Sequence, residues 1–213
     1  MTKQDFKKSE KQFYTGKVGR FDVIDVPEMN YLMIDGDGGP VGEKYPPSIA
    51  ALYALSYGLK FMSKQTPHGD YVVGPLQGLW WADDMNTFIT REKSAWKWTM
   101  MIRQPDWIDA HMLETARETA IAKLNKKKDA ATTEDYLQAV RLERFAEGQG
   151  VQVLHVGSYD DEGPILEQMH HQFIPENGYQ MRGIHHEIYL SDPRKVAPEK
   201  LKTILRQPIE SVG

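Results

Sequence analysis

One acidic side chain lies in the middle of a strand-like stretch, residues 185–192 (His-His-Glu-Ile-Tyr-Leu-Ser-Asp). An unpaired buried charge is expensive, so a carboxylate in such a place is normally neutralised, paired or functional. Because strand side chains alternate, Glu187 should share one face with Tyr189. Ile188 and Leu190 then take the other face, where they can pack on a helix. We therefore expect Glu187 to point toward a ligand cleft and to act as a general base or to orient a water molecule.

Two other interpretations of this stretch are a structural salt bridge and a metal site. A salt bridge from Glu187 to Arg103 or Arg182 would make the carboxylate structural. Adjacent strand residues diverge to opposite faces, so His185 and His186 cannot share a metal ion, and no HExxH or HxH spacing accompanies them. We expect no metal ion. We also expect no cofactor, because the glycine-rich turn at residues 35–40 matches neither GxGxxG nor GxxxxGK[ST].

Four of the five tryptophans fall in two short segments, at positions 80, 81, 96 and 98. Indoles with few polar partners can stack a flat ligand, although tryptophan also commonly fills a core. Trp80 and Trp81 are consecutive and must point to opposite faces, so one of them is expected to line the cleft. We predict Trp81 and Trp98 as walls of an aromatic cage, with Trp80 as the alternative. Further walls are expected from Tyr71, Phe173 and Tyr179.

Two side chains are candidates for hydrogen bonding to a ligand oxygen. His155 lies in the strand-like segment 151–156, and Tyr71 precedes the first tryptophan pair. Either could donate to a carbonyl that gains negative charge during a reaction. The alternative for His155 is a structural histidine whose ring is already hydrogen-bonded.

The composition is that of an ordinary globular protein: 213 residues, 40% hydrophobic and 26% charged. Thirty acidic against 26 basic residues give a formal net charge of −4, so there is no general positive field for nucleic acid or an anionic membrane. We expect neither as a partner. The chain has no cysteine and no apolar run long enough to cross a bilayer. Cytoplasm is the expected location.

Hydrophobic periodicity predicts a mixed α+β chain. The expected strands are residues 21–26, 31–34, 71–76, 79–82, 96–102, 151–156, 185–192 and 201–205. The expected helices are residues 48–62, two helices between 107 and 147, the second through Leu137, Val140 and Phe145, and a short helix at 165–173. Residues 1–20 are predicted to form a charged, solvated N-terminal arm held by aromatic anchors.

Two segments end alike: Met101-Ile102-Arg103-Gln104-Pro105 and Ile204-Leu205-Arg206-Gln207-Pro208. Each follows a strand, a helix and a further strand, so the chain is predicted to contain a repeated strand-helix-strand-strand unit. We place repeat one at about 21–105, a helical connection at 107–147 and repeat two at 151–210, within one domain, 21–213. Two such units can form a ligand cleft where their sheets meet.

Three motifs resemble a known family. They are Pro-Leu-Gln-Gly-Leu-Trp-Trp at 75–81, Glu147-Gly148 with Gln-Val-Leu-His-Val-Gly at 152–157, and His-Glu-Ile-Tyr-Leu-Ser-Asp-Pro at 186–193. Across residues 20–210 the chain resembles the GyrI-like small-molecule-binding domains. The resemblance implies a tandem of βαββ units around a central ligand cleft. It also implies that the glutamate matching Glu187 sits in the ligand cavity and meets cationic or polar ligand groups.

Within this family the chain is similar to the stand-alone members that include cyclopropyl hydrolases of DNA-alkylating cyclopropanoid compounds, which use an aromatic cage. The resemblance therefore implies an aromatic or lipophilic small-molecule ligand and ring opening by a water that Glu187 orients. Two alternatives stay open. One is binding or sequestration without chemistry, and the other is a protein-interaction module acting on a target such as gyrase, which would present an exposed apolar patch.

Overall fold

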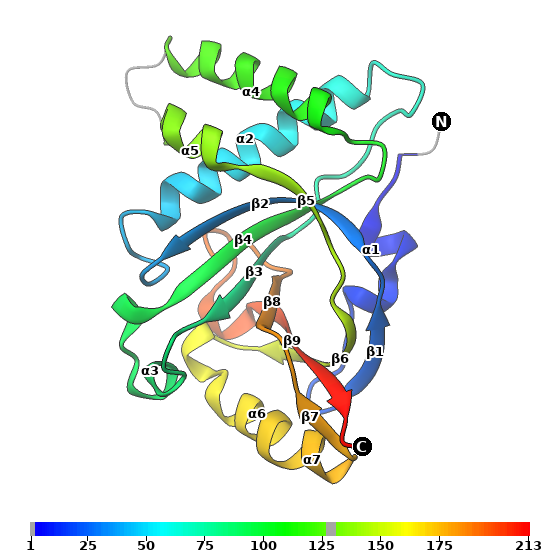
Figure 1. Cartoon of the computed structure of the whole chain (residues 1–213), viewed down its shortest axis with the longest axis vertical. Coiled ribbons are helices and arrows are strands. Elements are labelled where there is room, and N and C mark those ends of the chain that lie inside the picture. The colour runs from blue at the N-terminus through cyan, green and yellow to red at the C-terminus, as the bar shows by residue number, and fades with distance from the viewer. Residues whose placement is uncertain (1–2, 127–130) are drawn as a thin grey trace. The chain divides into compact units, whose positions relative to one another are not determined.

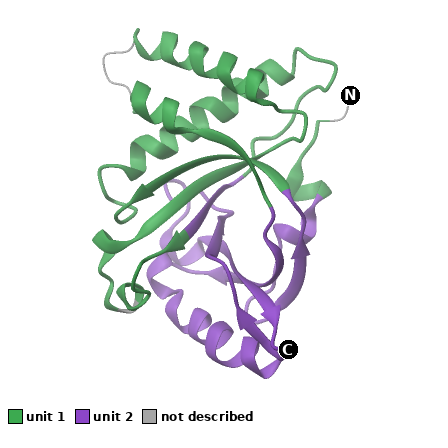
Figure 2. Ribbon diagram, in the orientation of Figure 1, with its two compact units in different colours: residues 1–9, 29–74, 80–145 green, residues 10–28, 75–79, 146–213 purple. Residues whose placement is uncertain are grey.

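The computed structural model describes residues 3–126 and 131–213, so small parts of the predicted N-terminal arm (1–2) and helical connection (127–130) lie outside the described residues (Figure 1). The chain divides into two compact units, each assembled from segments that are distant in sequence (Figure 2). Unit 1 comprises residues 1–9, 29–74 and 80–145, and unit 2 comprises residues 10–28, 75–79 and 146–213. Each unit is described by itself below.

Unit 1 contains an antiparallel sheet covered by helices. Its strands run in the order β4-β2-β5, with bounds β2 (Met29–Asp37), β4 (Lys97–Gln104) and β5 (Arg141–Phe145). Leu32 at the centre of β2 is paired with Ile102 on one side and Leu142 on the other. Helix α2 (Tyr45–Ser63) packs on β2 and β4, and the helices α4 (Ala110–Leu124) and α5 (Glu134–Ala139) pack on α2.

Helix α2 begins three residues earlier than the sequence pattern predicts. Its first turn contains Pro46 and Pro47. The first turn of a helix tolerates proline because its amide groups have no intrahelical acceptor. Leu52, Leu55 and Leu59 recur at helical spacing and are fully buried against the sheet. The buried face of α2 thus fixes its position on unit 1.

The strands of unit 2 run in the order β1-β6-β9-β8, with antiparallel pairing, and β7 pairs with the end of β9. The bounds are β1 (Asp22–Val26), β6 (Gly148–Val156), β7 (Tyr179–Met181), β8 (His185–Tyr189) and β9 (Lys202–Ser211). A continuous helical segment follows β6 along the chain. It consists of α6 (Gly163–Gln168), the π-helical turn η4 (Met169–Phe173) and α7 (Ile174–Glu176).

The core of unit 2 lies between this helical segment and one face of its sheet. Its fully buried members are Val151, Val153, Met169, Ile174, Leu205 and Ile209. Since the strand residues in this set are spaced by two on β6 and by four on β9, they mark a single sheet face as the apolar one. Polar side chains that alternate in step with these apolar residues must therefore also lie on the face that the helical segment covers.

Two predicted elements are wrong. Residues 71–76 do not form a strand, because only Tyr71 makes an isolated bridge, to Gln4, and strand β3 (Leu76–Trp81) begins after Pro75. The second predicted helix of the connection ends at Ala139, and residues 141–145 form strand β5 instead. This segment pairs with β2, so tertiary pairing overrides its helix-like apolar spacing.

The N-terminal segment is anchored by aromatic side chains, as predicted. Phe6 in α1 (Phe6–Ser9) and Phe13 in the 3₁₀ turn η1 (Lys11–Phe13) are buried, while the lysines around them are exposed. The remaining short elements are α3 (Asn86–Thr90), η2 (Lys93–Ala95), η3 (Tyr159–Asp161) and η5 (Pro198–Lys200).

The predicted fold class is confirmed. Along the chain, β2, α2, β3 and β4 form one strand-helix-strand-strand series, and β6, α6, β8 and β9 form the second. Both Arg-Gln-Pro tails fall at corresponding places, at the end of β4 and within β9. Within the part of the chain that the structure describes, no helix is long and apolar enough to cross a membrane.

Candidate functional site

Strand β8 alternates as the sequence predicts. His186 and Ile188 are fully buried, whereas His185, Glu187 and Tyr189 on the other face are half-buried. A strand whose two faces differ in this way holds its side chains in a fixed direction, because a slip by one residue would exchange the faces. Glu187 is therefore held on a defined side of unit 2.

The helix covers the opposite face of β8 from the one expected. Glu187 pairs with Leu205 across β8 and β9, and directly opposed residues share a face. Leu205 belongs to the core that packs under the helical segment beside Met169. Glu187 thus lies on the helix-covered face, and Ile188 does not. The reversal arises because Val153 and Leu205, on strands β6 and β9, supply the apolar surface that the helix needs.

The Glu187 carboxylate is hydrogen-bonded by one residue of its own strand and lies near a second. The Tyr189 hydroxyl donates a hydrogen bond to Oε2 at 2.7 Å, and His185 Nε2 lies 3.7 Å from Oε1. The Glu187 side chain is 15% exposed. The ring of Tyr159 packs edge-on against that of Tyr189, with centroids 5.6 Å apart. The carboxylate is therefore orientated by a hydroxyl on one oxygen, with an imidazole beside the other.

Arg182, one of the two arginines considered as a salt-bridge partner, is bound elsewhere in unit 2. Arg182 donates to the backbone carbonyl oxygens of Ile209 and Glu147. Arg103, in unit 1, donates to backbone carbonyls and to Asp106. The contacts of Arg182 therefore do not support a structural salt bridge between Arg182 and Glu187.

Several buried polar atoms near Glu187 have no hydrogen-bond partner among the described residues. They are both ring nitrogens of His185, Nε2 of His170 and the hydroxyl of Thr203. Thr203 is paired with Tyr189, and the His170 ring lies 6.2 Å from that of His185. Buried polar groups are nearly always satisfied, so a cluster of unsatisfied ones marks a site with a further role. This cluster and Glu187 form the candidate site.

Burial and charge change the proton affinities of two residues at this site. Burial, reinforced by the neighbouring imidazoles of His185 and His171, lowers the pKa of His170 to about 4. Burial and the nearby carboxylates of Glu162 and Glu187 raise the pKa of Tyr159 to about 12. Both groups are therefore neutral near pH 7. This face thus presents a neutral imidazole, that of His170, and a neutral phenol, that of Tyr159, in the part of unit 2 that holds Glu187.

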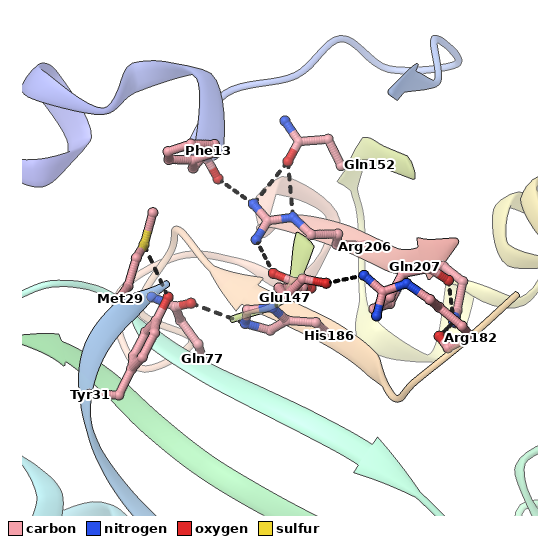
Figure 3. Close-up of polar contacts among 11 residues, drawn as sticks. Phe13, Met29, Tyr31, Gln77, Glu147, Gln152, Arg182, His186, Arg206 and Gln207 are labelled. Carbon is pink, nitrogen blue, oxygen red and sulfur yellow. Dashed lines mark hydrogen bonds and ion pairs between the residues drawn. The ribbon is translucent and has the colours of Figure 1, made fainter. Parts of the chain in front are cut away.

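The opposite face of the same strands holds a buried ion network, drawn in Figure 3. Arg206 binds Glu147 at 2.7 Å, and His186 contacts Glu147 at 3.0 Å through Nδ1 and Gln77 at 3.0 Å through Nε2. Arg206 also binds the side-chain oxygen of Gln152. These contacts fix β8 and β9 from behind the candidate site.

The pKa values within this network show which groups are charged. Burial by itself would raise the pKa of Glu147, but the charge of Arg206 and the bond to His186 hold it at about 2. Burial lowers the pKa of His186 despite the nearby Glu147. The network therefore contains an ionised Glu147–Arg206 pair, and burial disfavours the charged form of His186.

Unit 1 contains a buried cluster of aromatic rings. Tyr45 lies edge-on to Trp98 at 5.4 Å and stacks with Trp80 at 6.2 Å. Trp80 in turn lies edge-on to Trp96, which stacks on Phe88 at 4.6 Å. Among these, Trp98 is fully buried and Trp80 is nearly so. The cluster fills the side of unit 1 next to the glycine-rich turn.

The predicted cage residues of unit 1 take different places in it. Trp80 and Trp98 belong to the aromatic cluster, and Trp81, at the end of β3, is half-buried. Tyr71 is fully buried, and its hydroxyl donates to the side-chain oxygen of Gln104 at 3.0 Å. Burial raises the pKa of Tyr71. In this position Tyr71 is a neutral donor already engaged within unit 1.

The predicted residues of unit 2 lie on the same face as Glu187. His155 pairs with Thr203, which pairs with Tyr189, so His155 lies two strands, or about 10 Å, from Tyr189. Its Nε2 is 3.0 Å from the carbonyl oxygen of Ser158. Phe173 and Tyr179 pack at the edge of the apolar core. Unit 2 therefore brings His155 and Glu187 to one face and places the two aromatic residues in its core wall.

Sequence reasoning missed His170, Tyr159 and Tyr45. His170 and Tyr159 come from the segment between β6 and β8, where neither the acidic turn nor the helix-like pattern predicts a site. Tyr45 precedes the two prolines and was not assigned to the helix. The His170-His171 pair could have indicated this site. The spacing of the apolar residues around it predicts that His170 lies on the inward face of this helical segment.

Two other features of the structure bear on where a ligand or metal ion could bind. Among the described residues, no group of three or more histidine, aspartate or glutamate side chains is arranged to hold a metal ion. A surface hollow of about 270 Å³ in unit 1 is lined by Asn30, Asp106, Ile108, Leu142 and Arg144. It contains none of the predicted site residues. The unsatisfied polar cluster around Glu187 is therefore the stronger candidate.

Two strand-helix-strand-strand motifs, one with a buried aromatic cluster and one with a carboxylate among polar side chains, characterise a ligand-binding α+β protein. The family model of the GyrI-like small molecule binding domain matches residues 20–210. The chain belongs to this family. No functionally curated protein matches its sequence.

Solved structures agree with this assignment. An uncharacterized conserved protein from Listeria innocua is 44% identical, with a TM-score of 0.86, and the match covers 98% of this chain and 100% of that one. A hydrolase from Listeria innocua is 42% identical, with a TM-score of 0.82 and the same coverage. The C-terminal domain of EcmrR is 13% identical, with a TM-score of 0.56 over 91% of this chain and 98% of that one, which is similarity of fold alone.

Proposed function

We propose that this protein binds planar hydrophobic or cationic xenobiotics and hydrolyses the strained cyclopropyl ring of DNA-alkylating cyclopropanoids. The observation that carries the proposal is the Glu187 carboxylate, which is mostly buried, orientated by Tyr189 and close to buried polar groups that have no hydrogen-bond partner among the described residues. A carboxylate in this setting can accept a proton from a water molecule. The hydrolase name of a structure 42% identical over nearly the whole chain supports the same reaction class.

The reaction can be written with few groups. The oxygen of a water molecule bonds to a ring carbon while Glu187 takes one of its protons. The strained carbon–carbon bond breaks, and its electron pair passes into the conjugated carbonyl group, whose oxygen gains negative charge. A hydrogen-bond donor stabilises that oxygen. His155, on the face of Glu187, is the candidate donor in unit 2, and Tyr71 is the candidate in unit 1.

Aromatic rings are expected to hold the planar part of the ligand by stacking. Within unit 2 the rings nearest to Glu187 are Tyr159 and Tyr189. Trp80, Trp81 and Trp98 are proposed as stacking residues of unit 1. Phe173 and Tyr179 are proposed as further ligand-contacting residues in unit 2.

The test uses a planar compound with a cyclopropane conjugated to a carbonyl group. We expect wild-type protein to convert it to a product heavier by one water, as measured by mass spectrometry. Glu187→Gln keeps the shape of the side chain but removes the base, so kcat should fall by about 10²–10⁴. Binding, followed by quenching of tryptophan fluorescence, should be largely retained. Glu176→Gln, an exposed position on α7, is the matched control and should keep full activity.

Turnover by Glu187→Gln at the wild-type rate would refute the role of the carboxylate. The second candidate function is sequestration without chemistry. It is favoured by the combination of a carboxylate with the adjacent rings of Tyr159 and Tyr189, which suits an organic cation. In that case wild-type protein would bind the compound and return it with unchanged mass.

A further inference from the structure

His185 is a buried imidazole whose structural role is unexplained. Its side chain is 10% exposed, and neither ring nitrogen has a hydrogen-bond partner among the residues that the structure describes. Leaving a buried polar atom unsatisfied costs about 1–3 kcal/mol. An apolar side chain would avoid this cost on the helix-covered face. The position therefore calls for a function that needs the imidazole itself.

The surroundings of His185 place it between a carboxylate and a second imidazole. Nε2 lies 3.7 Å from Oε1 of Glu187, a separation that a small rotation of either side chain reduces to hydrogen-bond length. On the other side, the His170 ring lies 6.2 Å away at 80°. The three side chains thus form a row of one proton acceptor and two imidazoles in unit 2.

The two oxygens of Glu187 are not equivalent in this arrangement. Oε2 accepts the hydroxyl proton of Tyr189, so this oxygen is engaged and Tyr189 acts as a donor. Oε1 is the oxygen beside His185. A proton taken up by Glu187 therefore has a nearby base on one side and a hydroxyl that is already donating on the other.

The groups that face His185 leave it able to accept a proton. From its own strand the charged neighbour is Glu187, with Oε1 3.7 Å from His185 Nε2. From η4 the neighbours are His170 and, beyond it, His171. His170 is neutral near pH 7, since its pKa is about 4. From β9 the residue opposite Glu187 is the apolar Leu205. Arg206 on β9 carries a fixed positive charge, but it pairs with His186 on the opposite face and is bound to Glu147.

We propose that His185 is a proton-relay residue, which accepts the proton that Glu187 removes from the attacking water. This inference rests on the proposed hydrolysis. The proton moves from water to Glu187 Oε1 and then to His185 Nε2. It leaves for solvent or for the oxygen of the opened product, so that one water is added and no oxidant or reductant is needed. The transfer returns Glu187 to its ionised form for the next turnover.

The experiment compares His185→Gln with the wild type on the same cyclopropane-carbonyl compound. We expect kcat to fall about tenfold or more while KM changes little, because the relay acts after binding. Added imidazole should restore part of the lost rate in the variant and leave the wild type unaffected. His111→Gln, at an exposed position on α4 of unit 1, is the matched control and should behave as wild type.

The pH–rate profile gives a second readout that a purely structural role would not change. In the wild type both Glu187 and His185 must be unprotonated, so the rate should fall with a slope approaching two at acid pH. In His185→Gln the slope should approach one. If the melting temperature of His185→Gln lies below the assay temperature, His185→Asn provides the same comparison with a smaller side chain.

The outcomes separate this inference from the proposed function. Wild-type kcat and an unchanged acid slope in His185→Gln, with Glu187→Gln inactive, would overturn the relay and leave the hydrolysis standing. A reduced rate that imidazole does not restore, with the acid slope unchanged, would also overturn the relay. Full activity in Glu187→Gln would instead overturn the proposed function itself.

Discussion

The two Arg-Gln-Pro tails occupy corresponding places in the two units but are used differently. Arg103 in unit 1 and Arg206 in unit 2 are both almost fully buried. Arg103 donates to backbone carbonyl oxygens, lies 4.9 Å from the Phe6 ring, and reaches an exposed carboxylate, Asp106. Arg206 instead binds Glu147, whose side chain is only 1% exposed. The same sequence thus ends one repeat in an arginine that binds backbone carbonyls and an exposed carboxylate, and the other in an arginine that binds a buried carboxylate.

The difference extends to the side chains around each tail. Unit 1 fills its interior with packed rings around Trp98, and unit 2 places Glu147, His186 and Gln152 around Arg206. Strand β8 of unit 2 is held from one side by this network and presents Glu187 on the other. The two repeats therefore differ in what they bury, packed aromatic rings in one and titratable groups in the other.

The largest expected effect is on the ion pair that distinguishes the two tails. Arg206→Met leaves Glu147 buried without its charge partner, which should lower the free energy of unfolding by about 3–5 kcal/mol. Arg103→Met loses hydrogen bonds to carbonyls while Asp106 remains in solvent, so its cost should be about 1–3 kcal/mol. Urea unfolding of both variants measures the difference. Equal losses would show that the two arginines play equivalent roles.

The next effect concerns the neutral imidazole next to the candidate site. His170 has a pKa of about 4 in the folded protein, below its ordinary value of 6.5, so the unfolded chain binds the extra proton between these values. Its contribution is fully present above pH 6.5 and is lost as the pH falls toward 4. His170→Gln should remove this share, up to about 3 kcal/mol, from the acid-induced loss of stability.

The measurement is the free energy of unfolding of wild type and His170→Gln at about pH 7.5 and about pH 5. The wild type should lose more stability on acidification than the variant. Burial also lowers the pKa of His186, so part of the pH dependence should remain in the variant. Parallel curves for the two proteins would contradict the burial argument for His170.

The smallest effect compares two glycines, one on a strand of unit 1 and one on the corresponding strand of unit 2. A Cβ added at Gly36 on β2 would come within 2.2 Å of the Trp98 ring, whereas at Gly150 on β6 the nearest atom, a backbone oxygen of Gln207, is 3.3 Å away. Gly36→Ala should therefore cost about 1–3 kcal/mol, because a buried indole must move. Gly150→Ala should cost less. Thermal melting of the two variants makes the comparison, and an equal or larger loss for Gly150→Ala would contradict it.

The sequence predicted most strands through their alternation and found the repeat through its two tails. It failed where local pattern and tertiary pairing disagreed. Residues 141–145 carry helix-compatible spacing but pair with β2, and residues 71–76 carry apolar side chains but are interrupted by Gly74 and Pro75. Propensity is a weak guide in short segments because the partner strand contributes more than the segment itself.

For the candidate site, the sequence by itself determined that Glu187 shares a face with His185 and Tyr189, because alternation along a strand is a local property. Only the tertiary structure decided which face this is. The apolar residues of β6 and β9 bring the helical segment over the side of Glu187, and with it His170, which no local pattern connects to β8. Burial, and therefore the pKa of about 4 for His170, follows from that packing and not from the residue types.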